Sequence, residues 1–265
     1  MADNIKRSPL CGRNFEYFSE DPYLSGKMAA SYVSGIQSQG VAACIKHFAA
    51  NNQEYQRMCT NSVIDERTFR EIYTTGFEIV VREANPLAIM SSYNMINGTY
   101  AFENRHLIQR LLRDEWGFDG CVISDWGACN DIVKSLKAGG NLEMPGCGKA
   151  SAEEIIKAVR DENLSERILD KRVDELLDVI LWTYEFKNYK TKYIDSDESK
   201  SVVLEERESI EPDFDAHHKL ARKAARESIV LLKNEGEILP IASDKKVALI
   251  GQMAATPRIH GGGSS

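Results

Sequence analysis

The chain has 265 residues, of which 43% are hydrophobic and 28% charged, and its formal net charge is −7. This composition is ordinary for a globular protein, and the length suffices for one α/β barrel or two modest domains. An acidic chain is poorly suited to nucleic acid, because neutralising phosphates needs a basic face. No apolar run reaches the roughly 18 residues of a membrane-spanning helix. We therefore expect neither nucleic acid nor membrane as a partner.

The positions of the cysteines and histidines argue against disulfide bonds and against a zinc site. Six cysteines are scattered without any C-x-x-C pair, and Cys44 and Cys121 fall in apolar runs, where a free thiol behaves as a small hydrophobe. The histidines never fall at ligand spacing with cysteines, and the opening MADNIKRSP lacks the apolar stretch of a secretory signal. We expect reduced thiols, a cytoplasmic protein, and no metal or cofactor.

Helical and strand-like segments alternate from the first third of the chain onward. Asp21-Pro22 is a helix start, because it combines an N-cap residue with proline at the first helical position, and the helix is expected to end by Gly40. An apolar strand, VAACI, follows at 41–45. Asp65 caps a second helix whose apolar stripe runs to Val80.

The alternation continues with short connections. Strands are expected at 87–92, 120–124 and 141–144, and helices at 104–116, 132–138, 152–161 and 165–186. Strands that are apolar throughout and alternate with helices are typical of a parallel sheet covered on both faces. Residues 1–186 are thus predicted to form an α/β domain, a partial (β/α) barrel of the TIM type.

The remainder of the chain has a different character. Residues 187–212 carry many charges without periodicity and are interpreted as a linker. A strong amphipathic helix is expected at 214–234 and a strand at 246–251. We interpret 213–265 as the start of a second α/β domain.

Polar residues follow three of the predicted strands at the point where each strand ends. Lys46-His47, Tyr93-Asn94 and Asp125-Trp126 come directly after apolar runs. Because the carboxyl ends of parallel strands form the site in barrels and open α/β sheets, these side chains should converge. Charged groups around an aromatic platform suit a sugar, and a carboxylate under the anomeric carbon could attack it.

The same residues also fit three different roles. Asp125 could equally be a helix N-cap. Lys46 could be the Schiff-base lysine of an aldolase-type barrel. The whole set could belong to a non-catalytic sugar-binding fragment.

A series of motifs resembles glycoside hydrolase family 3. The motifs occur in order as GRNFEYFSEDPYLSGKMA (12–29), IKHFAANNQE (45–54), DERTFREIY (65–73), MSSYN (90–94), DEWGFDG (114–120), VISDW (122–126) and ARESIVLLKNEGEILPI (225–241). IKHFAANNQE is similar to the two-domain bacterial β-glucosidases. The KHFPGHG-like motif of the N-acetylglucosaminidase branch is missing from this sequence.

The resemblance implies a retaining, exo-acting β-glucosidase that releases β-D-glucose from the non-reducing ends of β-glucosides or oligosaccharides. Asp125 would be the nucleophile that forms the glycosyl-enzyme. The resemblance also implies a set of substrate-binding residues: Arg13, Lys46, His47, Arg57, Tyr93 and Trp126. A β-xylosidase or another β-glycosidase of the same family is the alternative.

Two parts of the family pattern are not found in the sequence. An eight-stranded barrel needs about 250 residues, whereas 1–186 supplies four clear strands. The glutamate that the family's second domain contributes as acid/base has no counterpart, and Glu54, Glu143 and Asp21 are better explained as a loop acid, a strand-end acid and a helix cap. We therefore expect an internal fragment that carries the nucleophile. Its exposed barrel edges are expected to promote self-association.

Overall fold

The computed structural model describes residues 1–186, 191–196, 199–204 and 211–257. The chain divides into two compact units, Met1–Lys190 and Thr191–Ser265, and each is described by itself.

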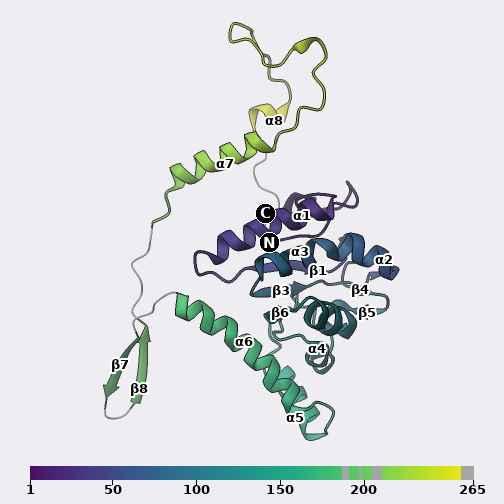
Figure 1. Cartoon of the computed structure of the whole chain (residues 1–265), viewed down its shortest axis with the longest axis vertical. Helices are drawn as coiled ribbons and strands as arrows, with labels where there is room; N and C mark the ends of the chain where they lie inside the picture. The colour runs from purple at the N-terminus through teal and green to yellow at the C-terminus, as the bar shows by residue number, and fades with distance from the viewer. Residues whose placement is uncertain (187–190, 197–198, 205–210, 258–265) are drawn as a thin grey trace. The chain divides into compact units, whose positions relative to one another are not determined.

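The first unit is built on a three-stranded parallel sheet (Figure 1). Its strands lie in the order β1 (Cys44–Phe48), β3 (Ala88–Ser91) and β6 (Cys121–Ile123). Single parallel bridges from Ala2 to Lys46 and from Ile123 to Leu142 extend the two edges. Parallel neighbours joined by helical crossovers are the unit of a (β/α) barrel, so the predicted α/β class is confirmed.

Helices connect these strands and cover the sheet. They are α1 (Pro22–Gln37), α2 (Glu66–Thr68), the π-helical η2 (Phe69–Thr74), α3 (Thr75–Ala84), the π-helical η4 (His106–Glu115), α4 (Ile132–Ala138), α5 (Lys149–Arg160) and α6 (Glu166–Phe186). Short 3-10 turns, η1 (Asn14–Glu16) and η3 (Ala101–Glu103), complete the set. Asp21 caps α1 by accepting from Tyr23 N, and Asp65 caps α2 by accepting from Thr68 N, as the sequence predicts.

The core lies between the sheet and helices α1, α3 and η4. Phe48, at the end of β1, is fully buried. The centroid of its ring lies 5.1 Å from that of Phe77 and 5.7 Å from that of Trp116. α1 packs closely on α3, because a Cβ at Gly26 would lie 3.0 Å from the Cα of Gly76. This packing fixes the carboxyl end of β1, which carries Lys46 and His47.

A small second sheet lies beside the main one in the first unit. It comprises β2 (Asn61–Ser62), β4 (Met95–Ile96) and β5 (Thr99–Tyr100). β4 and β5 form a hairpin whose two-residue loop, Asn97-Gly98, has positive φ at both positions. Asn-Gly is the favoured sequence for such a turn, so the hairpin has a local signal although no strands were predicted there.

The strand predicted at 141–144 is wrong in extent. Only Leu142 forms a bridge, to Ile123. The side chain of Asn141 replaces a backbone acceptor beside β6, since its Oδ1 accepts a hydrogen bond from Val122 N at 2.8 Å. A side-chain acceptor in place of a backbone carbonyl prevents a regular strand from continuing.

The second unit departs from the predictions in three places. Within 187–212, predicted as an aperiodic linker, β7 (Thr191–Ser196) and β8 (Ser199–Leu204) form an antiparallel hairpin; 187–190, 197–198 and 205–210 lie outside the described residues. α7 (Phe214–Ser228) ends before the predicted Asn234. No strand forms at 246–251; the described residues there have irregular backbone.

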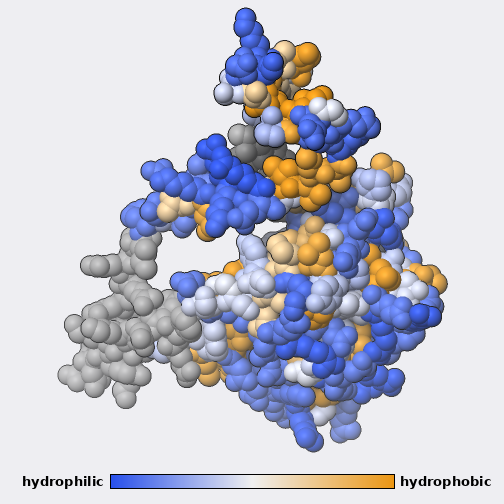
Figure 2. Space-filling model, turned by 45° about the horizontal axis from the view of Figure 1, so that its top comes forward, coloured by the Kyte–Doolittle hydropathy of each residue, from blue (hydrophilic) through white to orange (hydrophobic). Residues whose placement is uncertain are grey.

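The missing strand has a simple physical reason. A strand needs a partner for its backbone groups, and the described residues of 211–257 contain only α7, η5 (Glu235–Glu237) and α8 (Gln252–Ala255) as regular elements. No described residue of this range is buried, and its large apolar side chains are solvent-exposed, as the hydrophobic surface regions in Figure 2 illustrate. Hydrophobic pattern alone therefore predicted a strand that the fold does not form.

Candidate active site

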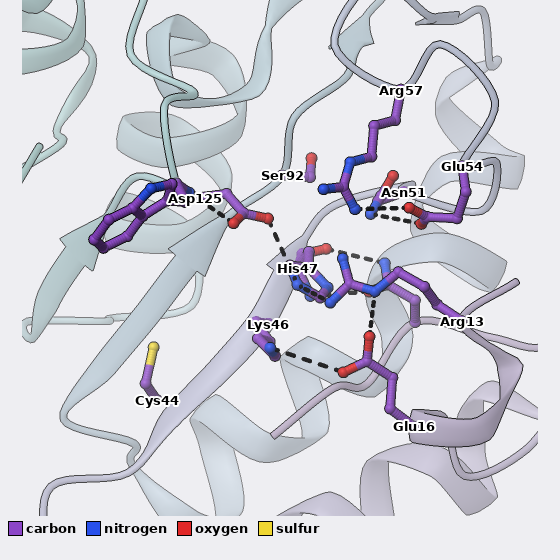
Figure 3. Close-up of polar contacts among 12 residues, drawn as sticks. Arg13, Glu16, Cys44, Lys46, His47, Asn51, Glu54, Arg57, Ser92 and Asp125 are labelled. Atoms are coloured by element: carbon purple, nitrogen blue, oxygen red, sulfur yellow. Dashed lines mark hydrogen bonds and ion pairs between the residues drawn. The ribbon is translucent and has the colours of Figure 1, made fainter. Parts of the chain in front are cut away.

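The carboxyl ends of the three parallel strands bring the predicted site residues together (Figure 3). Lys46 and His47 lie on β1, Tyr93 follows β3, and Asp125 follows β6. Arg13 lies directly before η1, and Arg57 lies in the loop after β1. The side chains that were expected to converge therefore do lie at one edge of the sheet.

Asp125 is buried, with 7% of its surface exposed, and its two carboxylate oxygens differ. Oδ1 accepts a hydrogen bond from the Trp126 backbone N at 2.7 Å, whereas Oδ2 has no hydrogen-bond partner. The helix-cap alternative fails because Asp131, not Asp125, caps α4 by accepting from Lys134 N. Asp125 thus keeps one buried carboxylate oxygen without a hydrogen bond.

His47 lies next to this free oxygen, with Nε2 3.6 Å from Asp125 Oδ2. Burial and the neighbouring Arg13 lower the pKa of His47 to about 2, so the imidazole is neutral. Arg13 Nη2 lies 2.9 Å from His47 Nε2, and because a guanidinium can only donate, we assign Nε2 as the acceptor and place the proton on Nδ1. The His47–Asp125 contact is therefore not an ion pair.

Glu16 connects the two cations on this side of the site. Its Oε1 accepts a short hydrogen bond from Arg13 Nε, and its Oε2 lies 3.7 Å from Lys46 Nζ. The side chains of Glu16 and Arg13 are mostly buried, with 16% and 15% exposed. A carboxylate shared by two cations lets them lie close together without unopposed repulsion.

Arg57 is held in a similar way on the other side. Its Nη1 lies 2.8 Å from Glu54 Oε2, and its guanidinium carbon lies 4.2 Å from the centroid of the Tyr93 ring. Asn51 Nδ2 donates to the second Glu54 oxygen at 3.4 Å. Burial, followed by the Asp125 carboxylate, raises the pKa of Tyr93, which keeps its phenol protonated beside that acid.

Trp126 differs from its neighbours because 63% of its surface is exposed. Its backbone is fixed by the hydrogen bond to Asp125 Oδ1, while its indole ring is open to solvent. An exposed aromatic face beside a buried carboxylate is suited to stacking against the apolar face of a sugar ring.

The three acids weighed as acid/base groups have other partners; Asp21 is the helix cap that the sequence predicted, whereas Glu143 does not end a regular strand. Asp21 caps α1, and Glu54 pairs with Arg57. Glu143 Oε2 accepts from Ser151 Oγ at 2.7 Å.

Glu16 was not singled out by the sequence motifs, and Glu54 was weighed only as an acid/base group and explained as a loop acid, yet both hold cations of the site. Each lies three residues from an arginine of the site, Glu16 after Arg13 and Glu54 before Arg57. An acid at this spacing from an arginine is the signal that could have identified them.

A parallel (β/α) arc with a carboxylate among cations at the strand ends is the arrangement of a barrel enzyme. The family model "Glycosyl hydrolase family 3 N terminal domain" matches residues 2–179. The chain belongs to glycosyl hydrolase family 3, which confirms the family predicted from the sequence motifs.

Individual relatives narrow the comparison. The chain is 51% identical over 262 residues to thermostable beta-glucosidase B of Acetivibrio thermocellus, covering 99% of this chain and 32% of that protein. It is 45% identical to an exo-alpha-(1->6)-L-arabinopyranosidase of Bifidobacterium longum, covering 99% of this chain and 33% of that protein.

Solved structures agree with the sequence relatives. Beta-glucosidase 3B of Thermotoga neapolitana in complex with alpha-D-glucose superposes with a TM-score of 0.80 at 47% identity, over 91% of this chain and 32% of that one. The GH3 beta-glucosidase of Bifidobacterium adolescentis superposes with a TM-score of 0.86 at 45% identity, over 97% of this chain and 35% of that one. The chain thus spans about a third of the length of these relatives. Among the described residues, no helix is both long and apolar enough to cross a membrane.

Proposed function

We propose that this chain is the nucleophile-bearing part of a retaining β-glucosidase that removes glucose from the non-reducing ends of β-glucosides or oligosaccharides. The observation that carries the proposal is the buried Asp125 carboxylate, whose Oδ2 has no hydrogen-bond partner, among the cations at the carboxyl ends of the strands (Figure 3). The beta-glucosidases among its relatives support glucose as the sugar.

Asp125 would supply the nucleophile of the first half-reaction. Oδ2 attacks the anomeric carbon, the bond to the leaving oxygen breaks, and a glycosyl-enzyme ester forms. Oδ1 keeps its hydrogen bond to the Trp126 backbone, which holds the carboxylate plane during the attack. Water then cleaves the ester and releases the sugar with its configuration retained.

The cations would bind the sugar hydroxyls. Arg13, Lys46 and Arg57 offer charge-assisted donors, and the Trp126 ring offers a platform. His47 is neutral, and its Nε2 accepts a hydrogen bond from Arg13. It would therefore orient that arginine as well as contact the sugar.

The general acid/base would come from a part of the longer protein. Retaining hydrolysis needs a second carboxyl about 5–5.5 Å from the nucleophile. Glu16 and Glu54, the acids that line the site beside Asp125, are both paired with cations. Neither is suited to delivering a proton to a leaving group.

Covalent labelling tests the proposal without requiring the acid. A 2-deoxy-2-fluoro-β-glucosyl donor with a dinitrophenolate leaving group departs unassisted, so the chain should gain one fluoroglucosyl mass on the peptide that contains Asp125. Asp125→Asn should abolish the label. Asp119→Asn, which changes an exposed acid on the approach to the same strand, should label like the parent.

Two results would overturn the proposal. One is a chain that stays unlabelled at saturating donor while it melts cooperatively and is therefore folded. The other is a label that persists in Asp125→Asn. Borohydride trapping of a carbonyl substrate on Lys46 would instead support the aldolase alternative.

Pentosyl donors are a second class of glycosyl donor to test on this chain. The arabinopyranosidase among the relatives makes an α-L-arabinopyranosyl donor the next one to test, and a β-xylosyl donor tests the xylosidase alternative. Faster labelling by a pentosyl donor than by the glucosyl donor would reassign the sugar but keep Asp125 as nucleophile.

We also propose a cytoplasmic location. All six cysteines are free thiols, including the exposed Cys59 and Cys147, as suits a reducing compartment.

A further inference from the structure

We propose a second binding site on this chain, for a small phosphate-bearing molecule, in a cavity outside the sugar site. The cavity has a volume of about 380 Å³. It lies between η4, α4 and the first two turns of α6, elements that belong to the first unit. Nothing in the proposed glucosidase chemistry uses it.

The charge of the cavity wall is unusual for so acidic a chain. Five cations line it together with Gln109, Ser165 and two apolar residues: Arg105, Lys137, Arg167, Lys171 and Arg172. Among the residues that the structure describes, no carboxylate lines the cavity. Like charges gathered without counter-charges repel one another, so this wall is stabilised when an anion enters.

Arg172 provides the second and independent observation. Its side chain is 4% exposed, yet Nε and Nη1 have no hydrogen-bond partner. A buried donor without a partner costs free energy, and a charged one costs more. An anion in the cavity would compensate this buried charge.

The salt bridge beside the cavity does not neutralise Arg172. Glu175 Oε1 lies 3.0 Å from Arg172 Nη2, but Glu175 Oε2 lies 3.1 Å from Arg113 Nη2. One carboxylate is therefore shared between two buried guanidinium groups, and one positive charge is left over. Burial lowers the pKa of both arginines, as expected where cations lack full compensation.

The other cations of the wall are also available. In the described part of the chain, none of Arg105, Arg167 and Lys171 forms an ion pair, and Lys137 Nζ contacts only the amide oxygen of Asn163, at 2.8 Å. Ser165, in the cavity wall, directly precedes α6, so the positive end of that helix dipole adds to the field.

The chemistry of this wall selects phosphate over a carboxylate. A phosphate group presents several oxygens and up to two negative charges, which matches a set of arginine forks and lysine point charges. The volume falls within the roughly 300–1,000 Å³ of small-molecule sites, so the ligand can be larger than the ion alone.

Titration calorimetry and phosphorus NMR on the chain test the site with pyrophosphate, inorganic phosphate and glucose 6-phosphate at about 0.15 M sodium chloride, close to physiological ionic strength. We expect saturable pyrophosphate binding to the parent. The double variant Arg167→Gln/Lys171→Gln, in which both positions are exposed and the fold should survive, should weaken it by about tenfold.

The matched control removes two cations elsewhere. Lys149→Gln/Arg160→Gln changes two exposed residues of α5 that have no ion pair in the described part of the chain, and it should bind pyrophosphate like the parent. Tighter binding of glucose 6-phosphate than of inorganic phosphate assigns the site to a phosphorylated sugar, and equal affinity assigns it to the free ion. Absence of saturable binding, or equal weakening in both double variants, overturns the proposal.

Discussion

At the scale of single residues, the candidate site depends on acids that never contact the reacting carbon. Glu16 holds Arg13 and Lys46, and Glu54 holds Arg57 against Tyr93. Long cationic side chains lose rotamer freedom when they bind a ligand. A carboxylate that fixes them beforehand removes part of that cost.

Glu16→Gln should weaken sugar binding without slowing the attack by Asp125. The amide still accepts from Arg13, but it no longer compensates the charge of Lys46. We expect the half-saturating concentration of the fluoroglucosyl donor to rise about tenfold, corresponding to about 1.4 kcal/mol, while the labelling rate at saturation stays within about twofold.

Glu83→Gln is the control for this experiment, because it removes an acid from an exposed pair with Lys27. Equal half-saturation in parent and Glu16→Gln would refute the positioning role of Glu16. A lower melting temperature with unchanged half-saturation would show that Glu16 is merely structural.

Asp3 should make the stability of the fold depend on pH. Burial raises the pKa of Asp3 to about 8, and neither of its oxygens has a hydrogen-bond partner. The folded chain thus keeps a proton that the unfolded chain releases near about pH 4. Between about pH 4 and pH 8 the unfolded state binds fewer protons, so the stability contributed by neutral Asp3 falls as pH rises.

Asp3→Asn removes this ionisation and should therefore flatten the decline. Its melting temperature relative to the parent should rise by about 8–16 °C between about pH 5 and pH 8.5, because a folded pKa of about 8 corresponds to a change of about 4 kcal/mol over this range. Scanning calorimetry at both pH values measures it. A difference between parent and variant that does not change with pH would contradict a buried, protonated Asp3.

At the scale of elements, local signals predicted the starts of helices well. Asp21 and Asp65 cap the helices that follow them, as predicted, and Asp131 caps α4, because a short acceptor side chain satisfies a free N–H of the first turn. The same local information failed where an element depends on distant partners. Neither 141–144 nor 246–251 is a regular strand, although both were predicted as strands.

Asp131→Ala should destabilise the first unit through α4. The carboxylate accepts from Lys134 N at 2.9 Å and also pairs with Lys134 Nζ at 2.8 Å. Loss of an N-cap costs about 0.5–2 kcal/mol, whereas an exposed pair contributes about 0–1 kcal/mol. Urea unfolding should show the larger loss for Asp131→Ala and a smaller one for Lys134→Ala. Equal losses would mean that the pair, not the cap, stabilises α4.

At the scale of the whole molecule, the two units differ in how much apolar surface they bury. The first has a continuous core around Phe48, Ile89 and Ile108. The described residues 211–257 have no buried residue, and Leu232 and Ile250 are 91% and 90% exposed. Exposed apolar surface of this kind is usually covered by another surface.

The chain by itself should therefore self-associate, and the sheet edges, each extended by a single bridge, should add to this tendency. Leu232→Glu/Ile250→Glu should shift the size distribution toward monomer in concentration-dependent sedimentation velocity. Leu10→Glu changes an equally exposed leucine of the first unit and should shift it less. A monodisperse parent monomer across the concentration range would contradict the prediction.

The sequence by itself determined the alternation of helices and strands in 1–186 and the set of side chains at the strand ends. Apolar periodicity and capping residues are local properties, and parallel strands necessarily place their carboxyl ends at one edge. Only the tertiary structure decided which oxygen of Asp125 is free, that His47 is neutral, and that Glu16 and Glu54 hold the cations. These properties depend on burial and on contacts between segments distant in the chain, such as His47 with Arg13, for which local sequence patterns carry no signal.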